Sequence, residues 1–201
     1  PAEEGGSGKV YIARDGYFDD VDIVLHWHPD DNNRAFFSSS NGNKSAKFKF
    51  KGISSHAAGA PQNGRSALDG VEAMNMMVNM LREHMDEEAR IHYVITKGGL
   101  APNVVPEEAE VYYYVRHPNV EGVRDLFNRV VKAAEGAAKG TETKMAFEVM
   151  HGNYPLMPNE TLSVLIDKEL KKLGGISYTD EEIIFAPVSY THLTLPTKEE
   201  V

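Results

Sequence analysis

The order of strand-like and helix-like patterns over residues 47–149 constrains the fold of this chain most strongly. Lysine alternates with phenylalanine in KFKFK (47–51), which predicts a strand with one buried face. Apolar residues then recur at intervals of three and four over 68–85, a spacing that predicts a long amphipathic helix. Two β-rich runs follow, RIHYVIT (90–96) and AEVYYYV (109–115), and each predicts a strand.

A second helix and a last strand complete this unit. Apolar spacing over 123–134 predicts the helix, and the run over 144–149 predicts the strand. The resulting order is β-α-β-β-α-β, which is the ferredoxin-like plan. We therefore expect an antiparallel sheet with two helices on one of its faces.

The segments on either side of this unit have a different character. Residues 10–16 suggest one or two helical turns, and VDIVLHWHP (21–29) is mostly apolar, which predicts a strand buried on both faces of a parallel sheet. Apolar spacing over 162–173 predicts a helix that stops at two glycines. EEIIFAP (181–187) is interpreted as a further strand.

These patterns predict an α/β chain in which a small domain is inserted into a larger one. Residues 1–44 and 156–186 are assigned to the larger α/β domain, and 45–155 to the ferredoxin-like domain. Residues 187–201 have no clear period and are interpreted as a non-native tail. The chain starts on proline, so we expect it to be an internal piece of a longer protein.

Composition excludes several classes of function. Thirty acidic residues against 21 basic ones give a net charge of −9, which argues against nucleic acid or an anionic membrane as a partner. The chain has no cysteine, so it contains neither a disulfide framework nor a thiolate site. No apolar run has the length that a bilayer-spanning helix needs. We expect a cytoplasmic protein.

Two adjacent carboxylates, Glu3 and Glu4, are the first candidates for chemistry. Neighbouring residues on a strand or a sharp turn point in different directions, so one acid can face a metal while the other faces a substrate. A solvated acidic loop is the alternative for such a pair. His26 ends the predicted strand over 21–29, at the position where open α/β sheets place their ligands.

Four segments carry a resemblance when they are taken together. PAEEGGSGKVYIARDG (1–16), LHWHP (25–29), KGISSHAAGAP (51–61) and GGLAPNVVPEEAEVYYYVR (98–116) are similar, in order and spacing, to the metal-dependent amidohydrolases of the aminoacylase and carboxypeptidase G type. The resemblance runs from residue 1 to about residue 185. It implies a zinc-peptidase-like α/β catalytic domain with an inserted ferredoxin-like dimerisation domain, which acts as a lid.

The resemblance also implies a metal centre. Glu3 would be the general base, and Glu4 and His26 would be metal ligands. The family uses two divalent ions, and mixed carboxylate and imidazole ligation suits zinc or manganese. A divalent metal lowers the pKa of its bound water, and a nearby carboxylate completes the activation. The family's other ligands fall outside these 201 residues, so we expect no turnover from this chain alone.

Three further residues receive roles from the resemblance. His56 would reach into the active site of the partner protomer and polarise the scissile carbonyl, whereas the alternative is an exposed loop histidine. Asn103 and Arg116 match positions that contact the carboxylate or carbonyl of the substrate. Arg116 has the alternative of pairing with one of the many acids of this chain.

The leading hypothesis is hydrolysis of the amide bond between an acyl or aroyl group and an amino acid, as in p-aminobenzoyl-glutamate. N-acyl amino acids and dipeptides are alternative substrates within the same family. The expected partner is a second copy bound through residues 45–155, or a second hydrolase subunit. A non-catalytic dimerisation module is a hypothesis of another class, and an unrelated acidic ferredoxin-like binding domain is a third.

Overall fold

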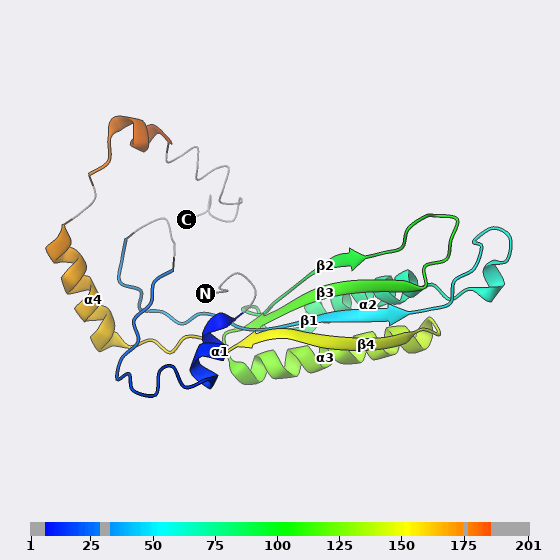
Figure 1. Cartoon of the computed structure of the whole chain (residues 1–201), viewed down its shortest axis with the longest axis horizontal. Helices are drawn as coiled ribbons and strands as arrows, with labels where there is room; N and C mark the ends of the chain where they lie inside the picture. The colour runs from blue at the N-terminus through cyan, green and yellow to red at the C-terminus, as the bar shows by residue number, and fades with distance from the viewer. Residues whose placement is uncertain (1–6, 29–32, 175–176, 186–201) are drawn as a thin grey trace. The chain divides into compact units, whose positions relative to one another are not determined.

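The computed structural model describes residues 7–28, 33–174 and 177–185 (Figure 1). The chain divides into two compact units. One comprises residues 1–27 and 38–158, and the other comprises 28–37 and 159–201. No helix in the described part of the chain is both long and apolar enough to cross a membrane.

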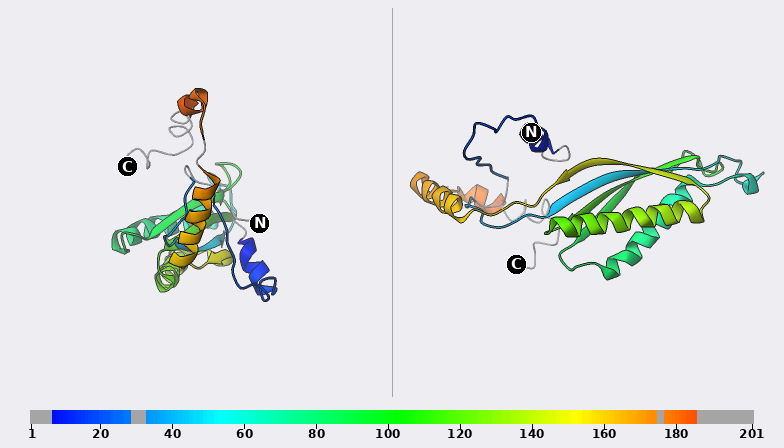
Figure 2. Two further views of the ribbon diagram at one scale, coloured as in Figure 1. Left: turned by 90° about the vertical axis from the view of Figure 1, so that its left-hand side faces the viewer. Right: turned by 90° about the horizontal axis from the view of Figure 1, so that it is seen from below.

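The first unit is built on a four-stranded antiparallel sheet in the order β2-β3-β1-β4. Its strands are β1 (Gly42–Lys51), β2 (Arg90–Lys97), β3 (Glu108–His117) and β4 (Lys144–Asn153). Helix α2 (Ala67–Leu81) follows β1 and helix α3 (Val120–Gly140) follows β3, and both lie on one side of the sheet (Figure 2). The predicted β-α-β-β-α-β plan is confirmed.

The core lies between this sheet and the two helices. Phe48 and Phe50 of β1 are buried and the lysines between them are not, as the alternation predicts. The ring of Phe48 meets the edge of Tyr113 at 5.8 Å between centroids. The Tyr113 hydroxyl donates to the Asn75 side-chain oxygen of α2 at 2.5 Å, which satisfies two buried polar groups.

The opposite face of the sheet is covered neither by α2 nor by α3. Its lysines are paired with acids on the neighbouring strands: Lys47 lies 3.2 Å from Glu110, and Lys49 lies 2.8 Å from Glu148. Lys49 lowers the pKa of the Glu148 carboxyl by hydrogen bonding and by its charge. Exposed pairs of this kind contribute little stability, so we interpret this half of the face as a solvated surface.

Two short helices lie before and after the sheet domain in the sequence. Helix α1 (Gly8–Arg14) confirms the turns predicted before Gly16. In the second unit, helix α4 (Glu160–Leu173) begins where the Asn159 side chain accepts a hydrogen bond from the Leu162 backbone N–H. It ends at Gly174, whose φ of 81° lies in the left-handed region that favours glycine. The helix predicted over 162–173 is confirmed.

The strand predicted over 21–29 is wrong for the residues that are described. Residues 21–28 form neither strand nor helix, and their side chains are exposed, Trp27 to 81%. A parallel-sheet strand needs neighbours on both sides to satisfy its backbone and cover its side chains. None of the described strands pairs with this segment, so its apolar run does not become a strand here.

The strand predicted over 181–187 is also wrong, because residues 180–185 are helical. The Glu182 backbone N–H donates to the Thr179 hydroxyl at 3.2 Å, and the Thr179 backbone N–H donates to the Glu182 carboxylate at 2.8 Å. This reciprocal pair is a capping box, which starts a helix by satisfying its first free N–H groups. The Thr-x-x-Glu spacing was visible in the sequence and outweighs the β-propensity of Ile183 and Ile184.

Candidate functional site

Two loops at one end of the sheet carry His56 and Asn103. His56 lies in the loop after β1, and Asn103 lies in the loop that joins β2 to β3 (Figure 1). The Ala57 backbone N–H donates to the Asn103 carbonyl oxygen at 3.0 Å, and His56 forms an isolated antiparallel bridge with Val104. The structure therefore brings His56 and Asn103 together, with both side chains exposed.

The ring of His56 is held from one side. Its Nδ1 atom accepts hydrogen bonds from the backbone N–H groups of Gly59, at 2.9 Å, and Ala58, at 3.2 Å. The Ala60 backbone N–H donates to the His56 carbonyl oxygen at 3.0 Å and closes the turn. The alternative of an exposed loop histidine describes its exposure, but the ring is anchored to the turn that follows it.

Arg116 lies at the other end of β3. Eight residues separate it from Glu108, where the strand leaves the Asn103 loop, so the two ends are about 27 Å apart. Its guanidinium lies over the Tyr114 ring, 5.5 Å from the centroid. Among the described residues no acid forms an ion pair with Arg116, so the alternative of a structural pair is not seen there. Within one chain, Arg116 is not brought to His56.

His151 of β4 faces the same end of the open sheet surface, and the sequence analysis gave it no role. Its Nε2 atom lies 3.1 Å from the Tyr114 hydroxyl, and the residue is 8% exposed. Burial lowers the pKa of His151, and the charge of Arg116 lowers it further. The strand register is the signal that could have found it, since Tyr114 and His151 both lie opposite Ser45.

The predicted metal-binding residues are not assembled in the described structure. Glu3 and Glu4 lie outside the described residues. His26 is exposed in an irregular segment, where it offers one imidazole. Within residues 7–28, 33–174 and 177–185, no three His, Asp or Glu side chains gather as a metal site.

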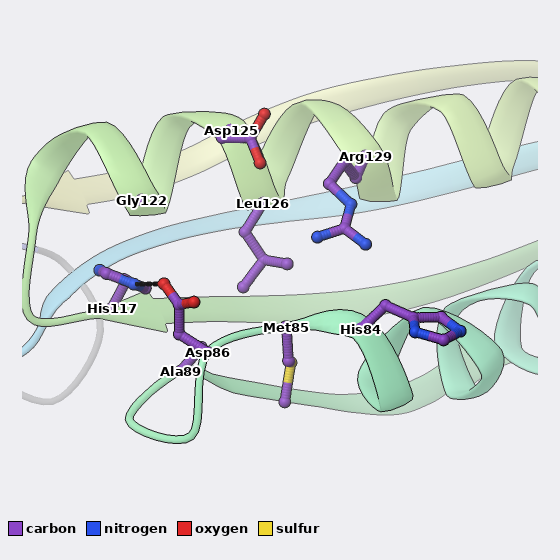
Figure 3. A pocket seen from close by; sticks show the side chains of 9 residues that line it. All are labelled: His84, Met85, Asp86, Ala89, His117, Gly122, Asp125, Leu126 and Arg129. Atoms are coloured by element: carbon purple, nitrogen blue, oxygen red, sulfur yellow. Dashed lines mark hydrogen bonds and ion pairs between the residues drawn. The ribbon is translucent and has the colours of Figure 1, made fainter.

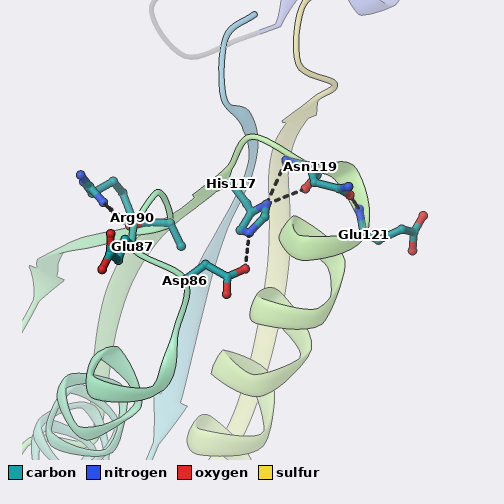
Figure 4. A network of polar contacts seen from close by, with 7 residues as sticks. Asp86, Glu87, Arg90, His117, Asn119 and Glu121 are labelled. Atoms are coloured by element: carbon teal, nitrogen blue, oxygen red, sulfur yellow. Dashed lines mark hydrogen bonds and ion pairs between the residues drawn. The ribbon is translucent and has the colours of Figure 1, made fainter.

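A small cavity lies between the start of α3 and the segment that joins α2 to β2, and none of the predicted site residues lines it (Figure 3). Its volume is about 100 Å³, below the roughly 300 Å³ at which pockets for small organic ligands begin. The His117 ring beside it bonds Asp86 through Nε2 at 2.8 Å and accepts from the Asn119 backbone N–H through Nδ1 at 2.9 Å (Figure 4). We interpret this network as structural, because it ties the end of β3 to the start of α3.

An exposed apolar surface runs along strand β2 and helix α2, and we call it the β2–α2 patch. Strand β2 is an edge of the sheet, and Arg82 at the end of α2 lies over the Tyr93 ring at 5.9 Å. The members of the patch are large apolar residues that are 37–62% exposed: Met76, Met77, Met80, Tyr93, Val94 and Ile95. An unpaired edge strand beside exposed apolar side chains is typical of a protein–protein interface.

Comparison with known proteins gives relatives that share most of this chain. It is 44% identical over 195 residues to one of the subunits of p-aminobenzoyl-glutamate hydrolase from Escherichia coli (strain K12), covering 96% of this chain and 40% of that protein. It is 31% identical to the Xaa-Arg dipeptidase of Mus musculus, covering 95% of this chain and 44% of that protein. The chain therefore spans less than half the length of these relatives.

Solved structures share the fold. A putative aminohydrolase from methicillin-resistant Staphylococcus aureus matches with a TM-score of 0.66 and 18% identity, over 86% of this chain and 48% of that one. An aminobenzoyl-glutamate utilization protein from Klebsiella pneumoniae matches with a TM-score of 0.57 and 19% identity, over 68% and 35%. The model of the peptidase dimerisation domain matches residues 38–142. This chain therefore belongs to the peptidase dimerisation domain family.

Proposed function

We propose that this chain is part of a metal-dependent amidohydrolase that cleaves the amide bond between an acyl or aroyl group and an amino acid. The observation that carries this proposal is the joined loop pair that presents His56 and Asn103 side by side and exposed. Similarity to the Escherichia coli p-aminobenzoyl-glutamate hydrolase over 96% of the chain supports a substrate of the p-aminobenzoyl-glutamate kind. N-acyl amino acids and dipeptides are alternatives, and the named dipeptidase supports the latter.

The spacing of the site residues indicates that the working site is shared between two protomers. His56 and Asn103 lie about 27 Å from Arg116, whereas one substrate must touch all three. A two-fold dimer resolves this, because it can place the His56 loop of one protomer near Arg116 of its partner. In this arrangement Arg116 binds the substrate carboxylate and His56 donates a hydrogen bond to the scissile carbonyl oxygen.

Glu4 and His26 would hold the metal, and Glu3 would take up the proton as general base. A carboxylate and an imidazole suit zinc or manganese, as the donor set of the proposed centre requires. When bound, the metal supplies a water of lowered pKa. Glu3 then holds the proton and delivers it to the leaving amine.

Titration calorimetry with zinc and with manganese tests this assignment. We expect saturable binding by the whole chain, weakened at least tenfold in both Glu4→Ala and His26→Ala. His92→Ala is the matched control, because His92 is an exposed strand histidine outside the proposed site and should bind like the wild type. Equal binding by all four proteins would contradict the ligand assignments. No binding by the wild type would favour the second candidate function.

The second candidate is a non-catalytic dimerisation module, and the β2–α2 patch favours it. The patch also supplies the homodimer contact that the shared site needs, within residues 45–155. A related second hydrolase chain is an alternative partner. The chain is 30% identical over 145 residues to a protein from Haemophilus influenzae that is described as a homolog of the other p-aminobenzoyl-glutamate hydrolase subunit.

Sedimentation of edge-strand variants tests the dimer contact. Ile95 on β2 and Val149 on β4 are 41% and 47% exposed and lie on opposite edges of the same sheet. We expect Ile95→Lys to raise the dimer dissociation constant at least tenfold, because it buries a charge in the contact. Val149→Lys should leave the constant unchanged. The reverse pattern would place the contact on β4, and a monomeric wild type would remove the shared-site proposal.

A further inference from the structure

The turn after His56 fixes which ring nitrogen of this histidine can carry a proton. A backbone N–H group can only donate, and two of them, from Ala58 and Gly59, point at the Nδ1 atom. An atom that accepts two hydrogen bonds cannot also carry a hydrogen on its single lone pair. In the neutral ring the proton must then sit on the other nitrogen, Nε2.

We propose that the turn over residues 57–60 is a tautomer lock, in which the Gly59 and Ala58 amides hold His56 as the neutral Nε2–H form. Gly59 and Ala58 are then positioning residues that act through His56. The opposite tautomer would carry a hydrogen on Nδ1, which would face two N–H groups and break both hydrogen bonds. Rotating the ring by half a turn would leave both amides facing a carbon.

The lock determines what His56 can do at the proposed site, and this step rests on the proposed function. Its Nε2 atom forms no hydrogen bond with any other described residue, and its side chain is exposed, so the N–H is available to a ligand. A nitrogen that carries hydrogen can donate to a carbonyl oxygen, but it can neither bind a metal nor accept a proton. His56 is thereby assigned as a neutral donor to the carbonyl, and metal ligation is excluded while the lock is closed.

Two neighbouring contacts hold the lock in place. The Ala57 N–H is bonded to the Asn103 carbonyl oxygen and the Ala60 N–H to the His56 carbonyl oxygen, both at 3.0 Å. The turn is therefore closed on itself and fastened to the Asn103 loop. This pre-organisation fixes the donor before any substrate arrives, which is the property that makes such donors effective in catalysis.

Gly59 allows a matched pair of variants. A Cβ at this position would lie 3.4 Å from the Nδ1 atom of His56, an ordinary contact, so Gly59→Ala keeps both the space and the N–H. Gly59→Pro removes the N–H alone among the donors to the ring. Any difference between the two variants then reports the hydrogen bond rather than the side chain.

Long-range proton–nitrogen NMR of the whole chain, with ¹⁵N-labelled histidine, reads the tautomer directly. At about pH 8.5, where free histidine is neutral, we expect the wild type and Gly59→Ala to show the Nε2–H form of His56. In Gly59→Pro the ratio of Nε2–H to Nδ1–H should fall about fivefold, the equivalent of one lost hydrogen bond. A wild-type ring in the Nδ1–H form, or equal ratios in the Ala and Pro variants, would overturn the proposal.

Folding of the variant is checked in the same samples. The amide spectrum of β1–β4 should be unchanged in Gly59→Pro; should it collapse, Ala58→Pro removes the other donor, and the wild-type tautomer still decides the first half of the proposal. The result is independent of hydrolysis. A locked tautomer without metal binding would contradict the proposed function alone, and metal binding without a locked tautomer would contradict the lock alone.

Discussion

The sheet domain and helix α4 show how differently the same kind of sequence pattern can be used. In the sheet domain, helix α3 repeats apolar residues and buries them, including Val123, Phe127 and Val130. Helix α4 has a similar repeat, yet it has no buried residue, and Leu165 is 48% exposed. The comparison teaches that an apolar repeat and a good cap suffice for a helix, whereas burial needs a second surface to pack against.

The largest expected effect tests this difference directly. Phe48 is fully buried between the sheet and α3, so Phe48→Ala should lower the free energy of unfolding by about 3–5 kcal/mol. Leu165→Ala removes a comparable apolar side chain from α4, and we expect it to change the free energy by less than about 0.5 kcal/mol. Urea denaturation followed by far-UV circular dichroism measures both.

Equal losses in the two variants would break the comparison. They would mean that the exposed face of α4 is covered in solution, for instance by a second copy of the chain. Repeating the denaturation at tenfold lower protein concentration separates these cases, since only stability that depends on association changes with concentration.

The same contrast explains which parts of the fold were predictable. The alternation in KFKFK and the apolar spacing over 123–134 each agree with the burial that the fold imposes, so the local pattern and the tertiary structure predict the same elements. The run over 21–29 carries the same apolar signal without a neighbouring strand in the described structure. For 180–185 the local capping box of Thr179 and Glu182 decided the helix, and β-propensity misled.

The candidate site was predictable in its residues but not in its arrangement. His56 and Asn103 were found by their motifs, yet only the backbone bonds between their loops show that they lie together. The sequence also could not reveal that Arg116 lies at the far end of β3, because separation along a strand becomes distance only when the register is known. The tautomer of His56 depends on a turn of four residues, which no pattern of side chains specifies.

A smaller effect sharpens the comparison within a single helix. Gly122 and Gly136 both lie in α3, but a Cβ at Gly122 would collide with the His117 ring, whereas at Gly136 the nearest atom would be the Met77 sulfur at 3.6 Å. We expect Gly122→Ala to cost about 1–3 kcal/mol, because the ring must leave its bonds to Asp86 and Asn119. Gly136→Ala should stabilise the protein by roughly 0.5–1 kcal/mol, since alanine is the better helix former.

The opposite signs make this pair informative. Helix propensity favours alanine at both positions, so any loss at Gly122 reports packing against His117 rather than the backbone. Adding His117→Ala to Gly122→Ala should recover most of the loss that Gly122→Ala adds, because the two residues contact each other and their effects are coupled. Stabilisation by Gly122→Ala alone would show that the His117 ring is not held in this network, and the contact between the end of β3 and the start of α3 would then have to be carried by the backbone.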